Sequence, residues 1–457
     1  MNRRVVITGL GPLTGLGLGI GPTWEAVTAG RSAIAPIRAF DPAGFECRIA
    51  AEVAEFDVRQ VVPKTYRKAT KVMARDIELA VGAADLAARD ARLITRGTAP
   101  DAAKADGFTP SYAPARVGCH IGAGLIAAEL NELTAAMAEA RVAEGAGAGD
   151  FDIKKWGSEG MTHLTPLWLL KYLPNMLASH VTIIHDTQGP SNSITCGEAS
   201  AGLSIGESLR VIQRGQADAC FCGGAESKIN PMAFLRQLMT ERLNTTSNDE
   251  PAKAVRPFCQ TAEGTVIGEG GGIIILEALE TFQTRSAAGD GERPGAYAEI
   301  VGFGASQSVN PARRNLVPEP DGRGIAVAIR SALREAGVQP GDIDLIVPIG
   351  LGTGESDQAE AAALRRVFGG ALADIPVVSM KSMAGNCGAG AAGLDIAVTA
   401  KALAEQTVPA RINCEQPLDG LQVGTAVSQT AKLNYALTFS GGMGGQNAAM
   451  VLKRMDS

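Results

Sequence analysis

The chain has 457 residues, of which 55 are glycine, and only 4% of its residues are aromatic. This length suits two domains or one large two-lobed domain, and the glycine content with alanine-rich helical segments suits a close-packed α/β protein. The formal net charge of −6 offers no general basic surface, which argues against a nucleic-acid partner.

The N-terminus and the cysteines both indicate a cytoplasmic protein. The chain leads straight into the strand-like sequence VVITGL without a signal-peptide pattern, and no apolar run is long enough to span a bilayer. The eight cysteines are scattered, mostly in apolar or glycine-rich contexts, so buried free thiols are favoured over a metal site or a disulfide framework. We expect no metal and no cofactor.

Strands and helices are predicted to alternate through the first half of the chain. Residues 4–10 have the pattern of a buried strand that ends in the turn GLGPLTGLGLG, and a helix opens at residues 23–25. These glycines fit tight turns better than a dinucleotide site, because no compact unit ending in a ribose-binding carboxylate follows. Further patterns predict a helix over residues 77–88 and strands over residues 117–121, 217–223 and 273–276.

Two polar segments lie between these elements. Five basic residues recur at helix-like spacing and are interpreted by default as a solvated helix face: Lys64, Arg67, Lys68, Lys71 and Arg75. Residues 143–166 are polar, glycine-rich and aperiodic. This composition predicts a long surface loop or cap, where partner contacts or substrate gating often reside.

The stretch GPSNSITCGEASAGLSIG, residues 189–206, predicts a strand, a tight turn and the start of a helix. Leu203, Leu209 and Ile212 are spaced to bury one face of that helix. Backbone N–H groups at a helix N-terminus favour an anion or a thiolate. Either Cys196 or Glu198 could occupy this position, and the two imply different functions.

A second series of elements then repeats the first. Residues 298–304 echo the strand and GxG pattern of residues 5–11. The rest of the series is a predicted helix over 324–336 and predicted strands over 343–348, 377–380, 435–439 and 448–452. Two similar series predict an internal duplication, with halves at residues 1–258 and 259–457 and two layered α/β lobes.

Many short sequence blocks occur in an order typical of one family. They include RRVVITGLG, RVGCHIGAG, GPSNSI, GQADACFCGGAE, EGTVIGEGGG, EIVGFGAS, VSMKSMAGN and SGGMGGQNAAMVLK. In these blocks the chain resembles the β-ketoacyl-acyl carrier protein synthases of the thiolase superfamily, especially the elongating type II enzymes. The resemblance implies a dimer built on a duplicated αβαβα five-layered sandwich. It also implies a cysteine nucleophile at the elbow and two histidines that decarboxylate malonyl-carrier protein and stabilise the oxyanion.

Counted without a gap from both ends of the elbow, the family cysteine falls on Glu198, and Cys196 lies two residues earlier. The first family histidine falls on Ile349 and the second on Asn386. The four histidines of the chain, at positions 120, 163, 180 and 185, all precede the elbow, so neither histidine motif can be filled. The resemblance therefore implies that the Cys-His-His triad is absent.

Other family positions are kept or modestly changed. Leu351 replaces the first threonine of the first histidine motif, Thr353 keeps the second threonine, and Lys381 is retained. Three basic residues match family positions that dock acidic acyl carrier proteins: Lys64, Arg67 and Lys68.

A glycine-rich loop near the C-terminus matches the family loop that gives a backbone donor to the oxyanion hole. Met443 replaces its gating phenylalanine, between Gly442 and Gly444. A Glu198 carboxylate would accept those N–H groups itself and neutralise the helix end. The site would then be chemically closed while its architecture is preserved.

These observations favour one function over two alternatives. The favoured hypothesis is a non-condensing homologue that pairs with a complete ketosynthase and a carrier protein, as chain-length factors do, although those proteins usually have glutamine in place of the cysteine. One alternative is an acyltransferase or decarboxylase that uses Cys196 as nucleophile or Glu198 as base. The other is a structural homodimer without an acyl ligand.

Overall fold

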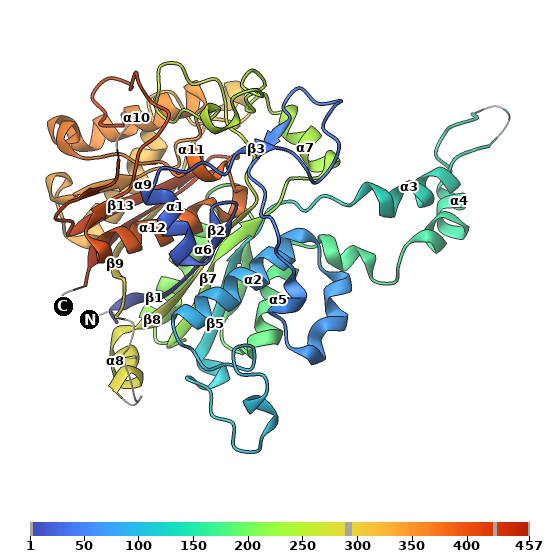
Figure 1. Ribbon diagram of the computed structural model, residues 1–457, viewed down its shortest axis with the longest axis horizontal. Helices are drawn as coiled ribbons and strands as arrows, with labels where there is room; N and C mark the ends of the chain where they lie inside the picture. Colours follow the sequence, from blue (N-terminus) through green and yellow to red (C-terminus); the bar gives the residue numbers. More distant parts are fainter. Residues whose placement is uncertain (1–2, 144, 146, 288–294, 424–426, 456–457) are drawn as a thin grey trace.

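The computed structural model describes residues 3–143, 145, 147–287, 295–423 and 427–455 (Figure 1). The longer strands are β1 (Val5–Thr14), β5 (Val117–Gly122), β6 (Ser191–Ile194), β7 (Ala219–Glu226), β8 (Gly270–Ala278), β9 (Ala298–Gln307), β10 (Leu345–Val347), β13 (Tyr435–Gly441) and β14 (Gln446–Arg454). The two-residue strands are β2 (Gly17–Leu18), β3 (Ala35–Pro36), β4 (Ile49–Ala50), β11 (Thr407–Val408) and β12 (Gln429–Thr430). The α-helices are α1 (Ile20–Thr28), α2 (Arg75–Asp90), α3 (Leu130–Glu139), α4 (Ile153–Ser158), α5 (Met176–His185), α6 (Ser200–Gln213), α7 (Pro231–Leu238), α8 (Leu279–Ala287), α9 (Arg323–Ala336), α10 (Gly354–Phe368), α11 (Lys381–Ala384) and α12 (Ala391–Glu405).

Most strands of the described chain join one ten-stranded sheet, in the order β10-β13-β14-β9-β1-β8-β7-β5-β6, with β2 beside β1. Its two halves repeat one pairing pattern. In the first half β5 pairs parallel with β7, β7 antiparallel with β8, and β8 antiparallel with β1. In the second half β10, β13, β14 and β9 pair in the same senses. The repeated topology confirms the predicted duplication.

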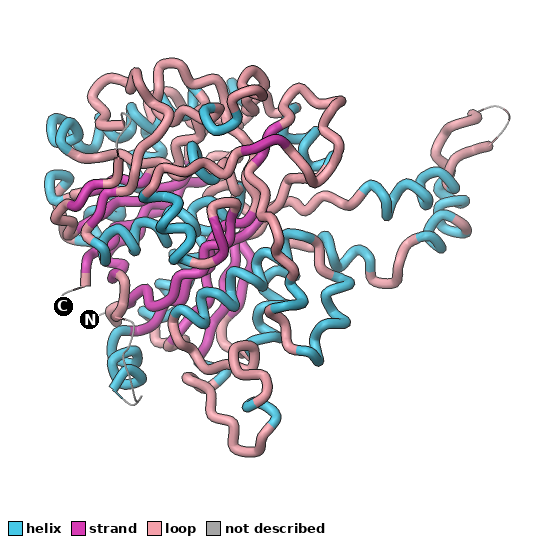
Figure 2. Tube along the Cα trace, viewed as in Figure 1, coloured by secondary structure: helices cyan, strands magenta, loops and turns pink. Residues whose placement is uncertain are grey.

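Helices form three layers around the two halves of the sheet (Figure 2). Helices α2 and α5 pack on the outer face of the first half, and α9 packs on the outer face of the second half with α10 against it. Helices α6 and α12 contact each other and strands of both halves, so they form the central layer. The predicted five-layered αβαβα arrangement is confirmed.

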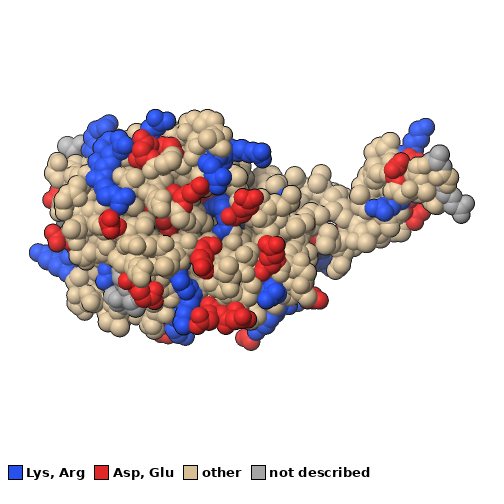
Figure 3. All heavy atoms as spheres, turned by 90° about the horizontal axis from the view of Figure 1, so that it is seen from above, with Lys and Arg blue, Asp and Glu red and all other residues tan. Residues whose placement is uncertain are grey.

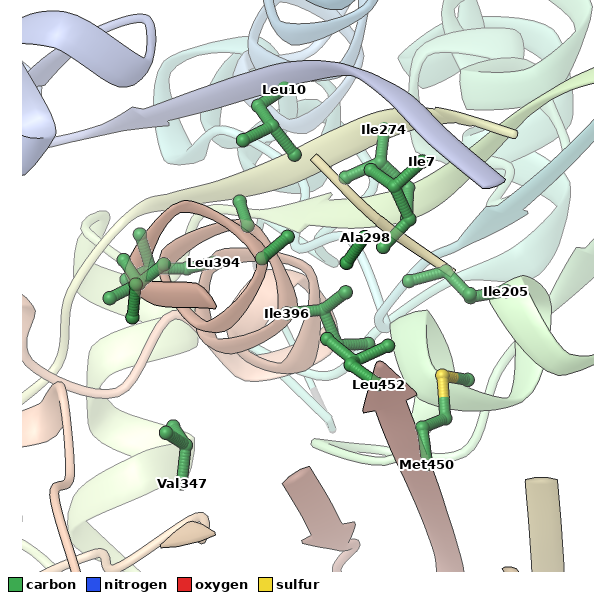
Figure 4. Close-up of a cluster of buried hydrophobic side chains, with 14 of the residues drawn as sticks. Ile7, Leu10, Ile205, Ile274, Ala298, Val347, Leu394, Ile396, Met450 and Leu452 are labelled. Atoms are coloured by element: carbon green, nitrogen blue, oxygen red, sulfur yellow. The ribbon is translucent and has the colours of Figure 1, made fainter. Parts of the chain in front are cut away.

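Apolar side chains on both faces of the strands explain why the sheet is covered on both sides. In β8, Ile274 and Leu276 pack into the central core, whereas Ile273 and Ile275 pack into the outer core beneath α2. Successive side chains point to opposite faces of a strand, so one apolar run serves two cores. Figure 4 shows the central core, where residues of the sheet such as Ile7 and Leu452 surround Leu394 and Ile396 of α12.

The glycines of the GxG repeats lie inside strands rather than in turns, which corrects the sequence prediction. A Cβ on Gly11 would lie 2.1 Å from the backbone oxygen of Ala83 in α2. A Cβ on Gly304 would lie 2.1 Å from the backbone oxygen of Ala328 in α9. Both glycines let an outer helix approach its strand closely, so the two motifs are matching packing contacts.

The strand predicted over residues 377–380 is not formed. In the first half β6 pairs parallel with β5, but the corresponding contact in the second half is a single bridge between Val377 and Ile346. The hydroxyl of Ser379 donates instead to the backbone oxygens of Ile349 and Gly350, and the chain then enters α11.

The predicted loop at residues 143–166 overlaps an arm, residues 130–163, that stands away from the body (Figure 3). Residues 144 and 146 of this segment lie outside the described residues. The rest includes α4 and the 3-10 helix η5 (Gly160–His163), which pack with α3. Asp152 caps α4 by accepting from the amides of Lys154 and Lys155. Helices this short have too few turns to show a periodic pattern, which explains why the sequence predicted a loop.

The predicted boundary between the halves, after residue 258, stays a prediction. Strand β8 follows that boundary and pairs with β1 and β7 of the first half. No helix in the described part of the chain is long and apolar enough to cross a membrane.

Candidate functional site

The elbow has the predicted strand, turn and helix, with Glu198 in the turn. Strand β6 ends at Ile194 and α6 begins at Ser200. Gly197 adopts a left-handed φ of 55°, and a Cβ there would lie 3.1 Å from the amide nitrogen of Met443. Glycine therefore permits the sharp turn and the close approach of the C-terminal loop. Of the three predicted helix contacts, Leu209 and Ile212 are fully buried and Leu203 is half-buried.

Glu198 is 4% exposed, and donors from three separate segments hold its carboxylate. Oε1 accepts from Arg242 Nη2 at 2.6 Å and from Asn386 Nδ2 at 3.1 Å. Oε2 accepts from the amide of Met443 at 3.0 Å. Burial opposes the charge, but Arg242, Lys228 and the backbone amides of Met443 and of Glu198 itself outweigh burial and lower the pKa of Glu198 to about 2. Glu198 is therefore an ionised carboxylate at neutral pH.

Arg242 is the main residue of the site that sequence reasoning missed. It follows α7, belongs to none of the recognised blocks, and is 7% exposed. Its Nε is buried without a hydrogen-bond partner among the described residues. A carboxylate at a buried elbow requires a cation nearby, but the sequence alone does not show which basic residue supplies it.

The two positions predicted to match the family histidines, Ile349 and Asn386, do not carry titratable groups. Ile349 is 1% exposed, and its side chain has no hydrogen-bonding atom. Asn386 is 6% exposed and uses its amide nitrogen on Glu198, while its side-chain oxygen accepts from the amide of Gly388. The described part of the site therefore has no imidazole.

Buried carboxylates hold the loop that carries Ile349, Leu351 and Thr353. Asp357 accepts from the amide of Gly352, and Glu360 accepts from the amide of Gly350. Burial raises the pKa of Asp357 above its ordinary value, against the lowering effect of backbone amides that include those of Phe258 and Gly352. Leu351 is 3% exposed, and the hydroxyl of Thr353 is buried without a partner among the described residues.

Lys381 forms a buried ion pair behind the site. Its Nζ lies 2.5 Å from Asp395 Oδ2, and both side chains are at most 1% exposed. Burial raises the pKa of Asp395 to about 6, while Lys381 counteracts this rise. The retained lysine is thus engaged by Asp395 and does not contact Glu198.

Cys196 lies on the strand side of the turn, as its position in the sequence predicts. Its backbone amide donates to Ser200 Oγ at 2.8 Å. Burial raises the pKa of its thiol, and no described base accepts a hydrogen bond from it. Cys196 consequently lacks the depressed pKa that activates a nucleophilic cysteine.

Two cavities lie beside the residues that hold Glu198. One, of about 460 Å³, is lined by Gly197 and Met443 among others. The other, of about 560 Å³, is lined by Arg242 and Thr353 among others, and Thr240 lines both cavities. Glu198 bonds to a lining residue of each cavity, Met443 and Arg242.

The basic residues near position 64 lie on the surface of the first half of the chain. Lys64, Arg67 and Lys68 are exposed on the 3-10 helix η2 (Lys64–Val72), and none has an ion-pair partner among the described residues. The predicted solvated face is wrong for Arg75, which opens α2 and donates to Glu269 and the backbone oxygen of Val53.

A duplicated five-layered sandwich with a helix N-terminus at its central layer is a thiolase-like architecture. The chain belongs to the β-ketoacyl synthase family. The family model described as beta-ketoacyl synthase, N-terminal domain, matches residues 2–281, and the corresponding C-terminal domain matches residues 297–415.

Relatives and solved structures agree with this family. The chain is 31% identical over 460 residues to 3-oxoacyl-[acyl-carrier-protein] synthase 2 of Coxiella burnetii, covering 99% of each chain. It is 32% identical to the protein of that name from Vibrio cholerae, covering 99% of this chain and all of the relative. A solved ishigamide ketosynthase/chain length factor is similar with a TM-score of 0.80 and 27% identity over the full length of both chains. A β-ketoacyl synthase from Burkholderia phymatum shares the fold with a TM-score of 0.80 and 24% identity.

Proposed function

We propose that this chain is a non-condensing subunit of the β-ketoacyl synthase family, which assembles with a catalytically complete ketosynthase that acts on acyl carrier protein. The observation that carries the proposal is the buried ion pair between Glu198 and Arg242. It fills the family's nucleophile position with an ionised carboxylate that is already satisfied.

The site lacks the groups that condensation requires: a nucleophile, a free oxyanion donor and a side chain that carries a proton. A carboxylate held at a pKa of about 2 is a weak nucleophile, and Met443 already donates its amide to Glu198 rather than to a substrate oxygen. Ile349 can neither donate a hydrogen bond nor carry a proton. Removing one oxyanion donor alone typically lowers the rate by ~10²–10³, and here both histidine positions are changed.

A partner subunit is supported by an edge strand and an apolar arm. Strand β6 ends the sheet and leads directly into the Glu198 turn. The arm and the segment that returns from it expose large apolar side chains: Leu125, Leu130, Met137, Phe151, Ile153, Met161, Leu167 and Leu169. Unpaired strand edges and exposed apolar groups of this extent favour association.

The similarity to the ishigamide ketosynthase/chain length factor supports a ketosynthase as the partner. A complete ketosynthase of this family shares the fold and therefore has an edge strand at the same place in its sheet. A carrier-protein contact is supported by the exposed residues Lys64, Arg67 and Lys68, which suit an acidic protein surface. The curated relatives carry acyl carrier protein in their names.

The test is co-expression with a complete ketosynthase encoded in the same genome, followed by native mass spectrometry. We expect a stable 1:1 complex. Ile153→Lys, on the arm, and Leu167→Lys, on the segment that returns from it, should weaken that complex. The exposed substitution Val327→Lys on α9, away from the arm, is the matched control and should leave it intact. A homodimer that ignores every complete ketosynthase offered would count against the proposal.

A further inference from the structure

A separate cavity lies in the first half of the chain, and neither Glu198 nor its hydrogen-bond partners line it. It has a volume of about 190 Å³ and lies between the loop that joins α2 to β5 and the C-terminal end of α5. This loop hangs below the first half of the sheet (Figure 1). The apolar and aromatic wall of the cavity is formed by Leu93, Ile94, Phe108, Pro110, Tyr112 and Val117.

Two polar side chains that line this cavity have unused hydrogen-bonding atoms. His185 and Thr187 are 4% and 8% exposed, and His185 Nε2 and Thr187 Oγ1 have no partner among the described residues. The other ring nitrogen, His185 Nδ1, lies 2.8 Å from Thr95 Oγ1, which fixes the ring. Buried polar atoms without partners are unfavourable, so a ligand that offers one hydrogen-bonding group would be stabilised here.

The electrostatics of the cavity favour a neutral ligand. Burial lowers the pKa of His185 to about 3, with a smaller contribution from Arg89, so the ring is uncharged at neutral pH. The charged groups at the cavity, Arg96 and Asp186, pair with each other at 2.8 Å. The site therefore offers aromatic and apolar surface, hydrogen-bonding atoms and no free charge.

We propose that this cavity binds a small neutral aromatic alcohol, with its ring against Phe108 and Tyr112 and its hydroxyl toward His185 and Thr187. Aromatic rings pack favourably against one another, and enclosed apolar cavities bind compounds of one-ring size. The hydroxyl supplies the partner that the two buried polar atoms lack.

Occupancy of the cavity is coupled to the edge strand. Thr187 begins the segment that leads into β6, where Gln188 donates to the backbone oxygen of Pro114 and Gly189 donates to that of Val117. Pro114 and Val117 also line the cavity. A ligand in the cavity would hold the two segments together and slow the opening of these two hydrogen bonds. The ligand site does not depend on the proposed function.

Binding is tested by titrating the purified full chain with phenol and with toluene, followed by ligand-observed nuclear magnetic resonance. We expect saturable binding of phenol that is about tenfold tighter than that of toluene, because toluene lacks the hydrogen bond. Thr187→Val, which keeps the shape of the side chain, should remove most of this preference and leave toluene binding unchanged. The matched control is Thr182→Val on α5, whose hydroxyl donates to Ser179 and does not line the cavity.

A second variant covers the case in which Thr187→Val fails to fold. Leu93→Phe adds a ring at another lining residue, should fill the cavity and should abolish binding of both compounds. Equal affinity for phenol and toluene, or no saturable binding of either, would overturn the proposal. Hydrogen exchange tests the coupling: phenol should slow exchange at the amides of Gln188 and Gly189, and unchanged exchange at saturating phenol would contradict it.

Discussion

Arg242 Nη2 donates to Glu198 Oε1 at 2.6 Å, with the two side chains only 8% and 5% exposed. The pair links the segment after α7 to the elbow before α6, and Asn386 and Met443 complete the set of donors. Taking two charges out of water is costly unless they are paired and hydrogen-bonded. The carboxylate of Glu198 is therefore committed to donors of the protein itself.

Removing Arg242 should destabilise the fold. Arg242→Met leaves the Glu198 carboxylate buried without its cation, which costs about 3–5 kcal/mol of the free energy of unfolding. Urea denaturation of the wild type and the variant measures the difference. Combining Glu198→Gln with Arg242→Met removes both charges and should recover most of the loss. A double variant that loses as much as the sum of the single variants would contradict the coupling.

The stability contributed by Glu198 should depend on pH with a defined sign. Its folded pKa is lowered to about 2 from an ordinary value of 4.5, so its contribution is complete above pH 4.5 and is lost as the pH falls from 4.5 to 2. The full contribution is about 3 kcal/mol, of which about 2 kcal/mol is lost by about pH 3.

Comparison with Glu198→Gln isolates this effect. The carboxyl groups with raised pKa values, such as Asp76 and Asp357, lower the stability of the fold as the pH rises, but they are common to both proteins. The difference in unfolding free energy between wild type and Glu198→Gln should shrink between about pH 7 and pH 3. A difference that is constant with pH would show that Glu198 is not the titrating group.

Placing a cysteine at position 198 should give a reactive thiol but not condensation. In Glu198→Cys the new thiol lies near Arg242 and the amide of Met443, which favour a thiolate. We expect rapid alkylation by iodoacetamide, detected by mass spectrometry at residue 198, and much slower labelling of Cys196 in the wild type. Recovered condensation with malonyl-carrier protein would refute the importance given to Ile349 and Asn386.

Charge reversal on η2 should weaken carrier-protein binding. The combined variant Lys64→Glu, Arg67→Glu and Lys68→Glu should lower affinity for acyl carrier protein by at least about tenfold at low salt, because complementary charges dominate such contacts. The control is Lys253→Glu, an exposed lysine already paired with Glu250. Equal affinity of the triple variant and the wild type in a salt titration would place the docking surface elsewhere.

The fold was predictable because its signals are local and repeated. Apolar runs such as that of β8 predict buried strands, and the paired GxG motifs of β1 and β9 mark the duplication. The helices within residues 143–166 and the missing strand near Val377 were not predictable. The six-residue helix α4 and the four-residue helix η5 are too short to show a period, and near Val377 the hydroxyl of Ser379 donates to the backbone of a neighbouring loop.

The candidate site was predictable only where residues could be counted along a recognised motif. Counting along the elbow placed Glu198, and the absence of histidines after position 185 agreed with it. Arg242 escaped because its contact with Glu198 depends on how the segment after α7 folds back over the elbow. No spacing between residues in the sequence predicts that Arg242 comes close to Glu198.

The most direct test is to identify which subunit carries acyl chains during turnover. The 1:1 complex with a complete ketosynthase would be incubated with acyl- and malonyl-carrier protein, quenched and analysed by peptide mass spectrometry. We predict acylation of the partner's active-site cysteine alone, β-ketoacyl product from the complex, and no product from this chain by itself. An acyl group on Cys196 or Glu198, or β-ketoacyl product from the isolated chain, would contradict the account.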